Sequence, residues 1–117
     1  MRITLQSKLS RGDATEGSAF TVTAKFYDDS SDPWTLSAPT TIRYRIDNLD
    51  TGNSVLDWIS ATPATSVSIA ITGAQNLTQS QYRPFERHQL TVQANAGLAT
   101  QCAETHNFQV NNVLGIT

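Results

Sequence analysis

Apolar and polar side chains alternate without a break along residues 41–47, which read Thr-Ile-Arg-Tyr-Arg-Ile-Asp. Because successive side chains of a β-strand point to opposite faces, one face carries Ile42, Tyr44 and Ile46. The opposite face carries Arg43, Arg45 and Asp47. An antiparallel sheet packed against a second sheet offers one dry face and one wet face. We therefore expect residues 41–47 to form the central strand of such a sheet.

The same alternation recurs in other segments, at residues 3–9, 18–27, 55–59, 65–72, 86–94 and 100–110. The clearest is 18–27, where the predicted inward set is Phe20, Val22, Ala24 and Phe26. In residues 65–72 the predicted inward set is Val67, Ile69 and Ile71. In the last segment we place Phe108 and Val110 inward.

Residues 55–59 allow two arrangements, with either Leu56 and Trp58 or Val55 and Ile59 pointing inward. We favour Trp58 in the core, because an indole is the largest apolar area available in this segment.

Turn-forming residues separate these segments. Glycines and small polar residues predict a loop at 10–17, and Asp-rich residues before a proline predict a turn at 28–33. Residues 48–53 have the Asn, Asp and Gly content of a hairpin connection, and 95–97 predict a tight turn. Residues 73–84 are polar and irregular, and we expect 111–117 to be a loose tail.

Seven alternating segments with no helical period predict an all-β, antiparallel sandwich that occupies residues 1–117 as one domain. This order of strands and hairpins resembles immunoglobulin-like and fibronectin-type-III-like domains. The antibody-type cysteine pair is absent, since Cys102 is the only cysteine. His88 stands two residues before Leu90, where a tyrosine corner would place a tyrosine. These departures favour the broad immunoglobulin-like fold over an antibody-like family.

Composition narrows the functional classes. A formal net charge of -2 with 15% charged residues predicts no binding to nucleic acid or to an acidic membrane surface. No apolar run approaches the roughly 20 residues that span a bilayer, so we expect no membrane insertion. The first residues carry no signal-peptide pattern, which predicts synthesis in the cytoplasm.

Four segments carry a narrower resemblance: residues 20–28, 44–47, 55–58 and 89–94. They resemble core strands of the small stand-alone immunoglobulin-like proteins of tailed bacteriophage particles. The resemblance implies a virion structural protein, either a capsid decoration or a head or tail fitting. It implies capsid or tail subunits as partners and attachment in several copies, with a homo-oligomer as one form. It transfers no functional residue.

Two groups of residues have the chemistry of metal ligands, and for both we favour the ordinary structural role. Asp28, Asp29 and Asp32 share one turn and could begin a Ca²⁺ site, but the distal glutamate of an EF-hand is absent. His88 and His106 would face each other across the final hairpin if its pairing centred near Gly97, with Glu104 beside them. We expect a solvated, backbone-capping turn, hydrogen-bonded or surface histidines, and neither a metal nor a cofactor.

For three further features we prefer an interpretation without a catalytic or recognition role. Cys102 lies four residues from His106, about 13 Å along a strand, too far for a nucleophile and its base. We expect a small buried hydrophobe there, or a surface thiol in the other facing. Residues 11–13, Arg-Gly-Asp, match an integrin-read tripeptide, and 76–78 match a glycosylation sequon. Both need secretion, for which the sequence shows no signal.

Two surfaces remain as candidates for recognition. Arg43, Arg45 and Arg87 fall on outward positions of neighbouring strands and would make a small basic strip. Such a strip is usually a solvated sheet face, but if the protein docks on an acidic subunit surface, we expect the contact here, through pairing with carboxylates. Trp34, Tyr27 and Tyr82 would form an aromatic patch near the loops, which either anchors those loops or receives a sugar ring or a subunit.

No acid/base pair, nucleophile or phosphate loop stands out, so the predicted protein is not an enzyme. We expect a virion protein that binds the particle surface, with capsid decoration favoured over a tail or neck fitting. The alternative is a module that recognises carbohydrate or a host surface through Trp34 and Tyr82, using loops at 10–17, 28–40 and 73–84.

Overall fold

The computed structural model describes residues 1–7, 13–15, 18–73, 75 and 85–111. Within these ranges the chain forms nine strands and no helix: β1 Arg2–Ser7, β2 Asp13–Thr15, β3 Phe20–Asp28, β4 Thr35–Leu36, β5 Ile42–Asn48, β6 Ser54–Ala61, β7 Ser66–Ile71, β8 Phe85–Ala94 and β9 Cys102–Asn111. The prediction of an all-β fold is confirmed, although seven strands were expected. In the described part of the chain no helix is long and apolar enough to span a membrane.

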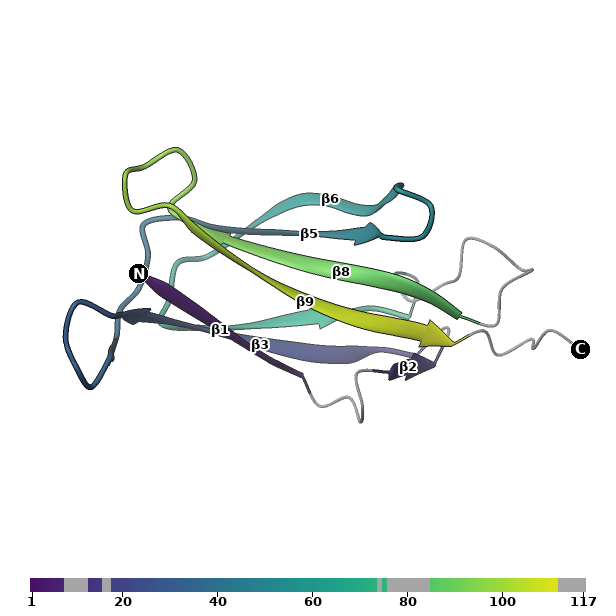
Figure 1. Cartoon of the computed structure of the whole chain (residues 1–117), viewed down its shortest axis with the longest axis horizontal. Coiled ribbons are helices and arrows are strands. Elements are labelled where there is room, and N and C mark those ends of the chain that lie inside the picture. Colours follow the sequence, from purple (N-terminus) through teal and green to yellow (C-terminus); the bar gives the residue numbers. More distant parts are fainter. Residues whose placement is uncertain (8–12, 16–17, 74, 76–84, 112–117) are drawn as a thin grey trace, which may run out of the picture.

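The strands form two layers, which Figure 1 shows one above the other. In the four-stranded sheet, β3 pairs with β1 on one side and with β7 and β4 on the other. The five-stranded sheet has the order β2-β9-β8-β5-β6. All pairs are antiparallel except β2 and β9, which run parallel. Two stacked sheets, antiparallel except for the β2–β9 pair, are compatible with the predicted β-sandwich.

The core lies between the two sheets. Val22, Ala24 and Phe26 of β3 and Ile71 of β7 are fully buried, and Ile69 of β7 is almost so. The five-stranded sheet contributes the other main buried side chains: Ile42, Ile46, Leu90, Val92, Ala94, Phe108 and Val110. The predicted inward faces of residues 18–27 and 65–72 are therefore confirmed, with Phe20 and Val67 half-buried at the margin.

The central strand of the larger sheet is β8, and the prediction that residues 41–47 would be central is wrong. Strand β5 is paired on both sides, with β6 and β8, but stands one position from the edge. Its predicted facing is confirmed, because Ile42 and Ile46 are buried and Tyr44 packs against the core.

Trp58 does not point into the core, contrary to the prediction. The pairing of β5 with β6 shifts register between Tyr44 and Ile46 and again between Ile46 and Asp47. These bulges insert extra residues into β6, so a strict period of two does not hold along it. Val55 and Leu56 both pack against the core, whereas the Trp58 ring lies beside the outward-facing Arg43.

Two predicted connections also differ. Residues 10–17 were expected to be a loop, but Asp13–Thr15 form β2, which pairs with Gln109 to Asn111 of β9, while 10–12 and 16–17 lie outside the described residues. The link between β8 and β9 is longer than a tight turn and runs from Asn95 to Gln101. Asn95 and Gly97 have φ of 56° and 80°, and the Asn95 carboxamide accepts the Thr40 N–H at 2.7 Å.

Candidate functional site

The outer face of the five-stranded sheet carries Trp58 between two arginines. The Cζ atoms of Arg43 and Arg45 lie 4.2 and 5.5 Å from the Trp58 ring centroid, within the range of cation–π attraction. Arg43 and Arg45 alternate with buried residues along β5, and β6 brings Trp58 beside them. We refer to Arg43, Arg45 and Trp58 as the Arg–Trp cluster.

The two arginines of this cluster differ in their remaining contacts. Arg45 donates from Nη2 to Asp47 Oδ1 at 2.8 Å, and Asp57 lies 3.9 Å from its Nη1. The hydrogen bond that Arg45 donates to the Asp47 carboxylate raises the pKa of Arg45. Arg43 donates from Nε to Gln93 Oε1 at 2.6 Å, and no carboxylate of the described residues pairs with it. Arg43 is therefore the member of the cluster whose charge remains for a partner.

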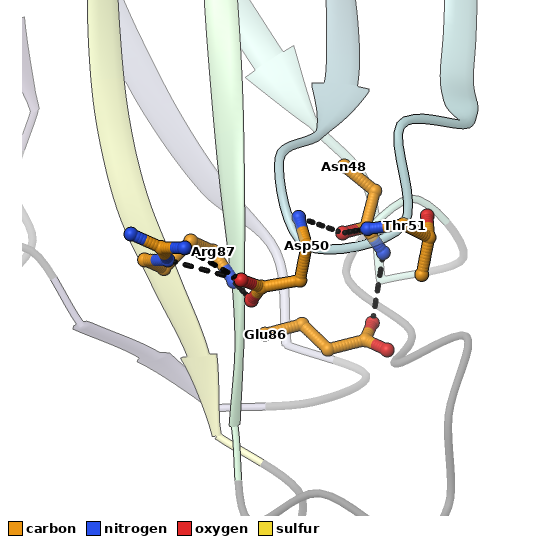
Figure 2. Close-up of polar contacts among 5 residues, drawn as sticks. All are labelled: Asn48, Asp50, Thr51, Glu86 and Arg87. Carbon is orange, nitrogen blue, oxygen red and sulfur yellow. Dashed lines mark hydrogen bonds and ion pairs between the residues drawn. The ribbon is translucent and has the colours of Figure 1, made fainter.

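The predicted basic strip of Arg43, Arg45 and Arg87 is not a free cationic surface. Arg87 donates from Nη2 and Nε to Asp50 Oδ1 at 2.8 and 3.1 Å, and its main-chain N–H donates to Asp50 Oδ2 at 2.8 Å (Figure 2). The hydrogen bond to Asp50 raises the pKa of Arg87. Arg45 pairs with Thr91 of β8, and Arg87 precedes Thr91 by four residues on the same strand, so the two arginines are not neighbours. Arg87 thus holds the β5–β6 hairpin against β8.

A buried polar cluster lies behind that ion pair. Asn48, Glu86 and His88 are fully buried, and Asn48 Nδ2 donates to Glu86 Oε1 at 3.2 Å (Figure 2). The Asn48 Oδ1 accepts the N–H groups of Asp50 and Thr51 at 2.9 and 3.2 Å. This cluster was not predicted, although the alternation along β8 places the even-numbered residues Glu86 and His88 on the inward face of the strand.

His88 and His106 do not face each other. His88 is opposite Phe108 and His106 is opposite Leu90, so the pairing centres one residue beyond Gly97. The nitrogens of His88 make no hydrogen bond to a described residue, although Nε2 lies 3.5 Å from Glu86 Oε1. Burial lowers the pKa of His88, an effect that the Glu86 carboxylate offsets only in part, and burial also lowers the pKa of His106.

The aspartate turn has structural contacts. Asp28 Oδ1 accepts the Ser30 N–H at 2.9 Å, and hydrogen bonding to Ser30 lowers the pKa of Asp28. Asp29 lies 3.3 Å from the Met1 ammonium group and 3.4 Å from Arg2 Nε. Among the described residues no three His, Cys, Asp or Glu side chains gather where they could hold a metal ion.

Trp34 forms part of an exposed aromatic surface. Its ring centroid lies 6.0 Å from that of Tyr27, and Arg2 Cζ lies 4.5 Å from it. Trp34 is 44% exposed and borders a hollow of about 340 Å³ that Tyr27, Pro33 and Thr4 also line. Tyr82, the other predicted aromatic residue, lies outside the described residues.

A second hollow of about 400 Å³ lies between β1 and β9 and shares Trp34 with the first. Cys102, at the start of β9, is half-buried against the core, and burial raises the pKa of its thiol. Of the Arg-Gly-Asp tripeptide only Asp13 is described, in β2, and the sequon at 76–78 lies outside the described residues.

No protein-family model matches the chain, and a comparison with curated proteins gives no significant match.

Proposed function

We propose that this protein is a non-enzymatic structural module that attaches to the surface of a virus particle through the outer face of its five-stranded sheet. The observation that carries the proposal is the Arg–Trp cluster, in which Trp58 stands between Arg43 and Arg45 on that face. Trp and Arg are the residues that most often dominate the binding energy of protein–protein interfaces.

The surroundings of the cluster support a docking face. Interface cores are depleted of Lys and Glu, and the described outward-facing residues of β5, β8 and β9 contain neither. Uncharged polar side chains fill most of the face, namely Gln89, Thr91, Gln93, Thr105, Asn107 and Gln109. These neutral side chains cost less to desolvate than charged ones would when a partner covers them.

The chemistry of the partner follows from the two kinds of side chain. The outer nitrogens of Arg43 can form a two-pronged pair with an Asp or Glu carboxylate. The half-buried Trp58 adds apolar area beside that pair, and its contact with Arg43 holds both side chains in place before binding. The expected partner is a subunit surface that presents a carboxylate next to an apolar patch.

A virus particle is proposed as the source of that subunit because four core segments resemble the immunoglobulin-like proteins of tailed phages. Capsid decoration is favoured over a tail or neck fitting, since the described chain is a small sandwich with no long projecting strand pair. Attachment in several copies, each through the same sheet face, would not require contact between the copies.

Mass spectrometry of particles purified from the source of the sequence tests this proposal. A copy number in the hundreds is expected for capsid decoration, whereas a small fixed number would indicate a tail or neck ring. Absence of the chain from the particles would refute attachment to a virion.

The docking face is tested with stripped particles and purified variants. Trp58→Ala and Arg43→Ala should each weaken binding by about 2 kcal/mol, roughly thirty-fold in Kd. Lys25→Ala is the matched control, because Lys25 is exposed on the opposite sheet. Equal affinities of all three variants would place the contact elsewhere.

Carbohydrate recognition is a second candidate, favoured by exposed Trp34. An indole beside Tyr27 at the edge of a hollow offers the apolar plate on which a sugar ring packs. Arg2 already covers part of this indole, which is the observation against it. A glycan array hit that Trp34→Ala abolishes would support this candidate, and an array without hits at high protein concentration would exclude it.

A further inference from the structure

The hollow between β1 and β9 is lined by uninterrupted runs of strand residues. It touches four consecutive residues of β1, Arg2 to Leu5, and three consecutive residues of β9, Glu104 to His106. Consecutive side chains of a strand point to opposite faces, so a hollow on one face would touch every second residue. A hollow that touches every residue in a run lies against the edge of the strand, where main-chain N–H and C=O groups point.

Both strands have a free edge at this place. Among the described strands, β1 pairs with β3 alone, and the outer side of β9 pairs with β2 alone, along Gln109 to Asn111. Figure 1 shows β1 and β9 running side by side here, in different sheets. From Cys102 to Phe108 no described strand pairs with the outer side of β9.

One hydrogen bond shows which main-chain groups face outward. The Thr105 N–H donates to the side chain of its own neighbour, at 3.2 Å from Glu104 Oε1, and so does not point toward β8. In an antiparallel pair, alternate residues direct both their N–H and C=O groups away from the partner strand. Ala103, Thr105 and Asn107 therefore present their main-chain groups on the free edge, and the exposed Glu104 carboxylate accepts the N–H of one of them, Thr105.

We propose that this edge of β9 is a binding site for an extended peptide segment of a partner protein, which adds to the five-stranded sheet in line with β2. The chain itself supplies the precedent, because β2 already adds to the same edge of β9 just beyond the open stretch. Unpaired strand edges bind extended peptides through main-chain hydrogen bonds, and pockets beside the edge select alternate side chains.

The walls of the hollow define the peptide. At about 3.3 Å per residue, the open stretch of β9 accommodates roughly six residues of extended chain. Side chains on one face of the added strand would lie against Leu5 and Trp34, which favours alternating apolar residues. Glu104 disfavours acidic residues beside it. This site is separate from the Arg–Trp cluster, so the two proposals can fail independently.

The test uses ¹⁵N-labelled full-length protein and eight-residue peptides in which Thr alternates with Val, Ile or Tyr. We expect chemical-shift changes confined to residues 2–5, 34 and 103–107, and slower hydrogen exchange of the Thr105 amide when peptide is bound. A second set of the same peptides carries N-methyl groups on every second amide, which removes the donors along one edge. Equal binding of both sets, shifts elsewhere, or no binding by any peptide overturns the proposal.

Two variants separate the main chain from the side chain. Thr105→Pro removes the outward N–H without removing a hydrogen bond to β8, and should lower peptide affinity at least tenfold, whereas Thr105→Ala should bind as the parent does. If Thr105→Pro does not fold, the N-methylated peptides decide the question alone. A concentration-dependent dimer that peptide does not dissociate would make a second copy the occupant and overturn the proposal.

Discussion

Replacing Asn48 by alanine tests whether the buried polar cluster holds the β5–β6 hairpin. The Asn48 carboxamide accepts two main-chain N–H groups and donates to Glu86, and the whole residue is buried. Each lost hydrogen bond costs about 0.5–1.5 kcal/mol, and leaving a buried carboxylate with one donor fewer adds about 1–3 kcal/mol. Since Glu86 keeps other contacts, we expect a total loss of about 3 kcal/mol.

The assay is urea unfolding at pH 7, supported by a thermal scan. For a domain of this size, a loss of about 3 kcal/mol corresponds to a fall in Tm of roughly 10–15 °C. Asn53→Ala is the control, because Asn53 is exposed in the same hairpin connection and should lose less than about 0.5 kcal/mol. Equal losses for the two variants would refute the reasoning.

Asn48→Asp tests, at the same position, the direction in which stability changes with pH. Aspartate keeps the two acceptor contacts but places a second carboxylate against Glu86, where two negative charges raise each other's tendency to hold a proton. The folded variant then binds more protons than the unfolded chain at acidic pH. We therefore expect Asn48→Asp to be less stable than the parent at pH 7 and the difference between the two to shrink as the pH falls, whereas the difference between Asn48→Ala and the parent should not shrink.

Three further predictions concern the core, the ion pair and pH. Ile46→Ala should cost about 2–5 kcal/mol in urea unfolding because Ile46 is fully buried, whereas Ile59→Ala, at 39% exposed, should cost less than half as much. Asp50→Ala should destabilise by about 1–3 kcal/mol because it also frees a main-chain donor, whereas Arg87→Ala, whose side chain is 62% exposed, should cost less than about 1 kcal/mol. Burial lowers the pKa of His88 below its unfolded value of about 6.5, so the unfolded chain binds more protons and stability should fall as the pH drops below about 6.5. Comparing urea midpoints at several pH values for the parent and His88→Phe should show a smaller acid loss in the variant.

The parts of the fold that the sequence predicts are those where one periodic pattern meets one buried face. Strand β3 alternates strictly from Phe20 to Phe26, and a slip of one residue would expose that entire face. The hairpin at 48–53 was likewise predictable, because Asn48 and Gly52 have the chemistry of the turn and Gly52 has a φ of 76°.

The predictions that were wrong concern features that depend on contacts with residues distant in the sequence. Trp58 was predicted to be buried because of its large apolar area. The bulges of β6 instead turn its side chain to the outer face, where the guanidinium groups of Arg43 and Arg45 contact the ring. Asp13–Thr15 is too short to show a period, and its pairing depends on the edge of β9. The His88 and His106 registers depend on the length of the β8–β9 connection, which exceeds the predicted tight turn.

Strand β8 buries two polar residues, Glu86 and His88, which its alternating pattern places on the same face as its apolar residues. Its inward row runs Glu86, His88, Leu90, Val92 and Ala94, and every member is buried. Turning the strand over would hydrate the two polar residues, each of which costs about 1–3 kcal/mol when buried without a full set of partners. It would also expose Leu90 and Val92, which contribute about 1.5–3 kcal/mol each, and would break the apolar contacts that they make. The hydrogen bond from Asn48 to Glu86 lowers the cost of burying the polar pair. The burial of the apolar residues therefore determines which face of β8 points inward, and Glu86 and His88 are buried with them.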